Sequence, residues 1–191
     1  MINKEHRTKS VILTLNWIIV CITSFTQVFN VTKLSGNVFL NTTVTAIFGG
    51  IPDKFFLWLS MKYGSRRFSL FIFQFLGGIF CIIIAFMPKE YELAVTTFYI
   101  LAGGAATSTF CLVYLITDEM YPTNLRTRAI GSCSFVCRIF GVSFVVIPKL
   151  ACIWKPLPML VLGVPSIIIG CTAYLLPETK NKTLPLAARN I

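Results

Sequence analysis

Six apolar stretches divide the sequence, and each is long enough to cross a membrane as a helix. A helix needs about 20 apolar residues to span roughly 30 Å of hydrocarbon. The stretches cover residues 11–30, 37–60, 68–87, 94–116, 129–148 and 157–176. The segments between them are short and leave no room for a soluble domain. The sequence therefore predicts an all-α integral membrane protein with six transmembrane helices, forming a single domain over residues 1–191.

The composition agrees with a lipid environment. Hydrophobic residues make up 55% of the chain and charged residues 13%, whereas soluble domains carry about 25% charged residues. A net charge of +10 on a soluble protein would suggest nucleic-acid binding. Here the basic residues lie mostly between the apolar stretches, so we expect the lipid bilayer, and no nucleic acid, as a partner.

The basic residues also predict the orientation of the helices, because lysine and arginine concentrate on the cytoplasmic side. One set of helix ends carries Lys4, Arg7, Lys9, Lys62, Arg66, Arg67, Arg126, Arg128, Lys180, Lys182 and Arg189, and the opposite ends carry Lys33, Lys89, Lys149 and Lys155. This bias places both termini in the cytoplasm. The sequon Asn30-Val-Thr32 then lies at an outer helix end, which makes Asn30 a candidate for glycosylation.

The sequence carries no pattern typical of an enzyme. We find no nucleophile–base motif and no phosphate-binding loop. The seven cysteines are scattered singly, mostly in apolar stretches, where cysteine behaves as a small hydrophobic residue. The small-residue run "AGGAATST", residues 102–109, predicts close helix packing instead. We therefore expect no catalytic activity, no metal and no cofactor.

Arg138 is a permanent positive charge inside the apolar stretch "SFVCRIFGVSF", residues 134–144. It is the tenth residue of the span 129–148, near mid-membrane, where a charge costs about 2.5–3.5 kcal/mol on insertion scales. Arginine cannot avoid this cost by losing its proton. We interpret Arg138 as a cavity residue that binds an anionic substrate. The alternative is a structural ion pair or a clamp on backbone carbonyls.

Lys54 lies in the second span, and its role is open between a cavity residue and a structural one. Four aromatic residues, Trp17, Phe25, Phe110 and Tyr114, are candidates to line the cavity and stack on an organic substrate. Because the chain contains 17 phenylalanines, most of them must face lipid or the protein core.

Two charged segments lie at the predicted cytoplasmic ends. They are "KYGSRR", residues 62–67, and "TDEMYPTNLRTR", residues 117–128. Opposite charges on neighbouring loops can hold helix ends together in one state and separate in another. They can equally be ordinary positive-inside loops with a helix cap. The candidate gating residues are Arg66, Arg67, Asp118, Glu119 and Arg126.

Several of these segments resemble the organic ion transporters of solute carrier family 22, within the major facilitator superfamily. The segment "DEMYPTNLRTRAIGS" resembles the family pattern E-x-Y-P-T-x-x-R, and "LLPETKNKTLP" resembles its L-P-E-T ending. The loop "KYGSRR" is similar to D-R-x-G-R-R, although Met61 replaces its aspartate and Ser65 the first arginine of its R-R pair. The opening "HRTKSVILTLNW" looks like the entry to the seventh helix.

The resemblance implies that this chain matches helices seven to twelve of a twelve-helix transporter. Such proteins carry organic anions, cations or zwitterions by alternating access of two six-helix halves. Anion-carrying members have a lysine at the position of Lys54 and an arginine at the position of Arg138, where cation transporters have aspartate. The resemblance thus favours an anion or a zwitterion, and it implies the plasma membrane as the location.

Three hypotheses follow from a chain that resembles half of a transporter. The chain is a fragment of a twelve-helix protein whose N-terminal six-helix half belongs to the same or a second chain. It is a stand-alone protein that transports as a homodimer. Or it is a truncated, non-transporting membrane protein that regulates or assembles with a full-length relative.

Overall fold

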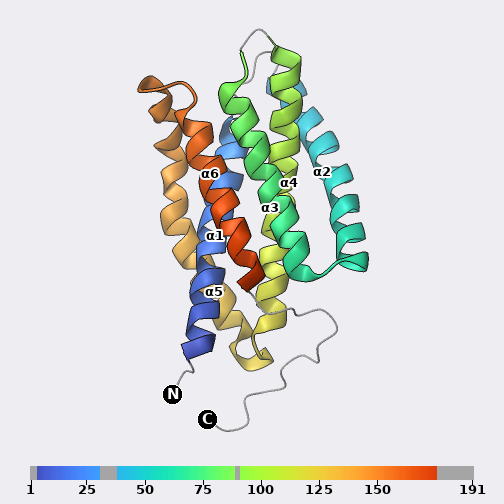
Figure 1. Ribbon diagram of the computed structural model, residues 1–191, viewed down its shortest axis with the longest axis vertical. Helices are drawn as coiled ribbons and strands as arrows, with labels where there is room; N and C mark the ends of the chain where they lie inside the picture. The colour runs from blue at the N-terminus through green and yellow to red at the C-terminus, as the bar shows by residue number, and fades with distance from the viewer. Residues whose placement is uncertain (1–3, 31–37, 89–90, 176–191) are drawn as a thin grey trace.

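A computed structural model of the protein describes residues 4–30, 38–88 and 91–175. These residues form α-helices and short 3₁₀ segments, without a strand among them (Figure 1). The α-helices are α1 (Lys4–Asn30), α2 (Val38–Tyr63), α3 (Arg66–Phe86), α4 (Glu92–Met120), α5 (Thr123–Gly141) and α6 (Leu157–Thr172). The 3₁₀ segments are η2 (Val142–Val145), η3 (Ile147–Cys152) and η4 (Ala173–Leu175).

The predicted all-helical membrane fold is confirmed. By length and composition, five segments are able to cross a membrane, namely Ser10–Val28, Arg66–Phe86, Glu92–Met120, Leu125–Cys152 and Leu157–Leu175. Helix α2 is as long as the others, with 26 residues. It is not among the five because its apolar run is interrupted by Asn41, by threonines and by the charged pair Asp53 and Lys54.

The fifth span differs most from its predicted bounds of 129–148. Helix α5 begins at Thr123, directly after Pro122, whose φ of −62° suits the start of a helix. From Val142 onward the α-helix gives way to η2 and η3. Pro148 in η3 has no N–H to donate and its ring crowds the preceding turn, which disfavours a continuous α-helix here. Sequence periodicity does not reveal such a change.

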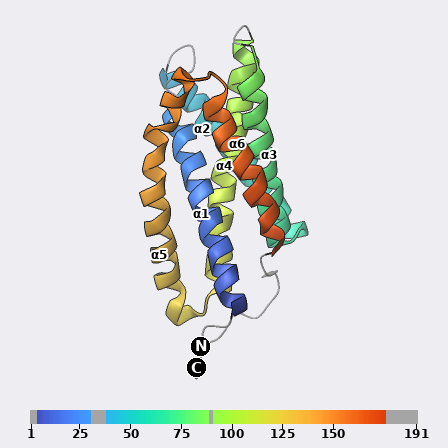
Figure 2. The ribbon, with the colours of Figure 1, turned by 60° about the vertical axis from the view of Figure 1, so that its left-hand side comes forward.

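The helices are arranged in two layers. Helix α1 packs against α4 on one flank and against α5 on the other, and α2 packs against the far side of α4. Helices α3 and α6 pack extensively on each other and cover one side of the α1–α4 pair (Figures 1 and 2). The described residues of α2 and α5 make no contact with each other. They therefore flank α1 and α4 without closing over them.

Two glycines set the close approach of α3 and α6. A Cβ atom on Gly163 would lie 2.8 Å from the carbonyl oxygen of Gly78, and one on Gly78 would lie 2.9 Å from the carbonyl oxygen of Gly163. Real side chains do not come this close to backbone, so glycine is required on both helices. Small residues that let backbones meet are a common basis of helix association in membranes.

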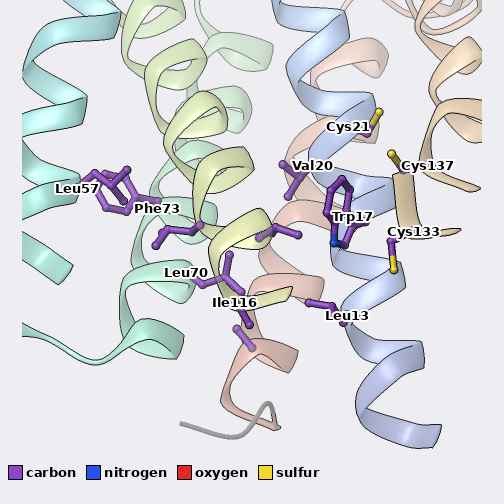
Figure 3. Packing of buried hydrophobic residues seen from close by; sticks show 13 residues of the cluster. Leu13, Trp17, Val20, Cys21, Leu57, Leu70, Phe73, Ile116, Cys133 and Cys137 are labelled. Atoms are coloured by element: carbon purple, nitrogen blue, oxygen red, sulfur yellow. The ribbon is translucent and has the colours of Figure 1, made fainter. Parts of the chain in front are cut away.

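The main core cluster joins α1, α3, α4 and α5. Leu13 and Trp17 of α1 are buried against Leu70 of α3 and Ile116 of α4 (Figure 3). Cys21 of α1 and Cys137 of α5 are also buried, and their sulfur atoms extend toward each other. These cysteines fill space between helices, as small hydrophobic residues do.

We predict that Gly163→Ala destabilises the protein by about 1–3 kcal/mol, because the added methyl group must displace the backbone of α3. The matched control is Gly131→Ala on α5, where a Cβ would meet nothing within 4 Å. Alanine favours a helix over glycine by roughly 0.5–1 kcal/mol, so the control should be neutral or slightly stabilised. Thermal unfolding in detergent checks both variants. Equal melting temperatures would contradict the role given to the α3–α6 crossing.

Candidate functional site

An aromatic cluster joins α1 and α4 near the centre of the bundle. The Trp17 ring lies 4.3 Å from the ring of Tyr114 and 6.1 Å from that of Phe110, both in edge-to-face geometry, measured between centroids. Phe110 and Tyr114 are themselves 5.2 Å apart. Such arrangements are favoured by the charge distribution of aromatic rings. Three of the four predicted cavity aromatics are thus brought together. Phe110 and Tyr114 are partly buried, whereas Trp17 is buried in the core and does not line a cavity.

The cluster is held in place by a buried hydrogen bond. The indole Nε1–H of Trp17 donates to Oγ1 of Thr117 at 3.0 Å, and Thr117 in turn donates to the carbonyl of Val113 at 2.6 Å. Trp17 is only 1% exposed. This bond fixes the orientation of the indole ring. Phe110 and Tyr114 pack against that ring.

Phe25, the remaining predicted aromatic, lies on the other flank of α1. Its ring centroid is 6.1 Å from that of Phe144 in η2. Gly141 of α5 lies beside it, because a Cβ on Gly141 would be 3.7 Å from the Phe25 ring and 3.3 Å from the sulfur of Cys21. Phe25 therefore belongs to the contact between α1 and the end of α5, and it does not join the Trp17 cluster.

Arg138 lies in the last turn of α5, one residue beyond the buried Cys137. It is the fourteenth of the 28 residues of the span Leu125–Cys152, which is halfway along it. Successive helix residues are about 100° apart, so Arg138 projects away from the seam that Cys137 occupies. The side chain is exposed, and the described part of the chain offers it no ion pair or hydrogen bond.

Lys54 is exposed on α2. It follows Gly50 by four residues, so it lies one helical turn further along the same side of the helix. Its neighbour Asp53 is part of α2, but the side chain of Asp53 lies outside what the structure describes.

A pocket of about 340 Å³ lies between α1, α2 and α4, and we call it the α1–α2–α4 pocket. Its lining residues are Ser24, Gln27, Val28, Thr42, Thr45, Ala46, Gly50, Tyr99, Gly103, Gly104, Thr107 and Phe110. Phe110 is therefore shared by the pocket and the aromatic cluster. Gly50 connects the pocket to the turn of α2 that carries Lys54.

The predicted gating residues meet at the opposite end of α4. Arg66, at the start of α3, places Nη2 3.2 Å from Oε1 of Glu119, near the end of α4. Arg126, in the first turns of α5, lies 3.9 Å from Asp118, measured from Nε to Oδ1. Arg67 is half-buried next to Arg66. The tertiary structure thus joins three helix ends through ion pairs, of which Arg66–Glu119 connects residues far apart in the sequence.

Ser65 is a residue whose role the sequence analysis missed. Its hydroxyl oxygen accepts a hydrogen bond from the backbone N–H of Phe68 at 3.2 Å, which makes it the N-cap of α3. A serine shortly before a long apolar run, here separated from it by Arg66 and Arg67, is a recognisable cap signal. The cap positions the first turn of α3, from which Arg66 reaches Glu119.

Asn30, the predicted glycosylation site, is the last residue of α1. The remaining sequon residues, 31 and 32, lie outside the described residues. Glycosylation of Asn30 therefore stays a prediction.

The sequence is similar to known transporters over nearly its whole length. It is 31% identical over 178 residues to an "Organic cation transporter-like protein" of Drosophila melanogaster, covering 93% of this chain and 31% of that protein. It is 33% identical over 144 residues to "Solute carrier family 22 member 6-A" of Xenopus laevis, covering 74% of this chain and 26% of that protein. With "Solute carrier family 22 member 3" of Rattus norvegicus it shares 27% identity over 188 residues, covering 98% and 34%.

This chain is homologous to the solute carrier family 22 organic ion transporters. No family model matches the chain. The chain spans about a third of the length of the curated relatives it matches. These solute carrier relatives are transporters and not enzymes, in agreement with the expectation from the sequence.

We predict that Thr117→Val destabilises the protein by about 1–3 kcal/mol, since it leaves the buried indole N–H of Trp17 without an acceptor. Thr117→Ser keeps the hydroxyl group and should lose less. Thermal unfolding compares the two variants, and tryptophan fluorescence reports on the indole environment. If the valine variant were as stable as the serine variant, the hydrogen bond would not be what holds the aromatic cluster.

Proposed function

We propose that this chain forms a six-helix half of a transporter that moves organic ions across the plasma membrane by alternating access. The observation that carries the proposal is the exposed Arg138, halfway along an apolar span. A guanidinium in hydrocarbon costs about 2.5–3.5 kcal/mol or more. An arginine at this depth therefore needs a polar cavity or an anionic partner, and a transport pathway supplies both.

We propose an organic anion or a zwitterion as the substrate. Arg138 and Lys54 are both exposed, and both are positively charged. The planar fork of arginine suits a carboxylate, which it can bind through two parallel hydrogen bonds. Two relatives from Drosophila melanogaster are named as an organic cation transporter or a protein like one. Our proposal of an anion or a zwitterion therefore rests on the charges of Arg138 and Lys54.

A second six-helix half completes the proposed pathway. Helices α3 and α6 cover one side of α1 and α4, whereas α2 and α5 flank the pair without meeting. The relatives are about three times as long as this chain, which leaves length for such a half. We propose that it faces Arg138 and Lys54, either from the same polypeptide or from a second one.

The ion pairs at the end of α4 act as the gate in this proposal. Arg66–Glu119 and Arg126–Asp118 connect the starts of α3 and α5 to α4. Alternating access requires contacts at one end of the bundle that form in one state and break in the other. Partly exposed ion pairs suit this role because each contributes little net stability.

We predict that Arg138→Ala lowers the affinity for an organic anion by about 10- to 100-fold, as expected for the loss of a charge-assisted hydrogen bond. Uptake of 6-carboxyfluorescein is measured in cells that express the complete product of the gene, including any residues beyond this chain. The matched control is Arg128→Ala, an exposed arginine on the same helix. If the Arg138 variant were expressed normally and its anion uptake were unchanged, this would contradict the proposal that Arg138 lies in the substrate cavity.

For the gate, we predict that Glu119→Arg lowers the maximal uptake rate by about fivefold or more, since it replaces attraction to Arg66 by repulsion. The charge swap Arg66→Glu with Glu119→Arg should recover part of the rate, because interacting pairs couple by about 0.5–3 kcal/mol. Glu92→Arg, at the other end of α4, is the control. A swap variant no faster than Glu119→Arg alone would argue against the gating pair.

A further inference from the structure

The α1–α2–α4 pocket has a size suited to part of a small organic molecule. Ligand pockets in proteins commonly measure about 300–1,000 Å³, and this one measures about 340 Å³. It is formed by three helices of the described chain, so its walls do not depend on a second half. The question is what such a pocket holds.

Two glycines keep the pocket wide. A Cβ atom built on Gly50 or on Gly103 would meet nothing within 4 Å. They differ in this respect from Gly78 and Gly163, whose missing side chains allow helix backbones to touch. The prediction that the run 102–109 serves close packing holds for Ala105, which lies 3.3 Å from a Cβ on Gly77. Gly103 in the same run instead leaves open space on the pocket wall.

Two hydroxyl groups of the pocket, those of Ser24 and Thr107, use their own protons within the protein. Thr107 donates its own proton to the carbonyl of Gly103 at 2.6 Å, and Ser24 donates to the carbonyl of Ala106 at 3.4 Å. A hydroxyl oxygen keeps acceptor capacity after its proton is used. Ser24 and Thr107 are thus able to accept hydrogen bonds from O–H or N–H groups of a ligand.

Among the described residues that line the pocket, only Tyr99 has an ionisable side chain, and its hydroxyl donates to the backbone carbonyl of Gln27. A charge placed there would lose its hydration without a compensating partner. Phe110 adds an aromatic surface at the end of the pocket nearest the Trp17 cluster. These features match an uncharged ring or chain with hydrogen-bond donors.

We propose that the α1–α2–α4 pocket binds the uncharged, hydrogen-bond-donating body of the organic ion, and that Gly50 and Gly103 set the size it accepts. This inference rests on the proposed function, in which the charged end of the substrate meets Lys54 and Arg138. Lys54 follows Gly50 by one helical turn, so a ligand seated in the pocket has a cationic group beside it. The glycines thus determine specificity, while the cationic side chains determine charge selection.

The size limit is tested with Gly103→Leu in the complete gene product. Uptake of the bulky anion 6-carboxyfluorescein is compared with uptake of the small anion benzoate. Filling the pocket should lower the ratio of bulky to small uptake at least tenfold. The control is Gly131→Leu, at a position that also has open space around it but does not line the pocket. Thermal unfolding confirms that both variants fold.

The hydrogen-bonding role is tested with Thr107→Val, which removes the hydroxyl and keeps the shape. Benzoate and 4-hydroxybenzoate differ only by one donor, so the wild-type preference for the hydroxylated anion should fall about fivefold. An unchanged preference together with an unchanged size ratio in Gly103→Leu would overturn the pocket assignment and leave the proposed function standing. If the wild-type protein takes up none of the three anions, the proposed function fails and this inference fails with it.

Discussion

The absence of water in the hydrocarbon region is the constraint on which the rest of this structure depends. A polar group in that region must find its partner within the protein. Thr26, Thr109 and Ser166 meet this demand locally, because each donates its hydroxyl proton to the carbonyl four residues earlier. Trp17 meets it across helices through Thr117. Helices that carry polar residues can therefore pack in the bilayer without unsatisfied hydroxyl or indole groups at these positions.

The same constraint explains why the depth of a charged residue in the bundle matters. Glu119 and Arg66 lie at helix ends, where each has the other as a partner. Arg138 lies halfway along a span and has no such partner in the described part of the chain. A charge that is paired at the end of a bundle is compatible with a structural contact. A charge that is exposed at mid-span is compatible with the polar pathway that we propose for this relative of organic ion transporters.

Glycine serves two opposite purposes in this bundle. Gly78 and Gly163 bring α3 and α6 into backbone contact, which builds the layer behind α1 and α4. Gly50 and Gly103 leave space on the other side of α4, within the α1–α2–α4 pocket. The first pair lets two helices of the scaffold pack closely. The second pair widens the wall where we propose that a substrate lies.

The sequence by itself determined the helical membrane fold, because apolar runs of about 20 residues have few alternatives in lipid. It also singled out Arg138, since a permanent charge inside such a run is conspicuous without any coordinates. Only the tertiary structure decided that Phe110 and Tyr114 share a cluster with Trp17 while Phe25 packs against α5. It likewise decided that Gly103 faces a pocket and Gly163 a backbone. The reason is physical: hydropathy and helical period are local properties, whereas contacts between helices depend on how distant segments are rotated toward each other.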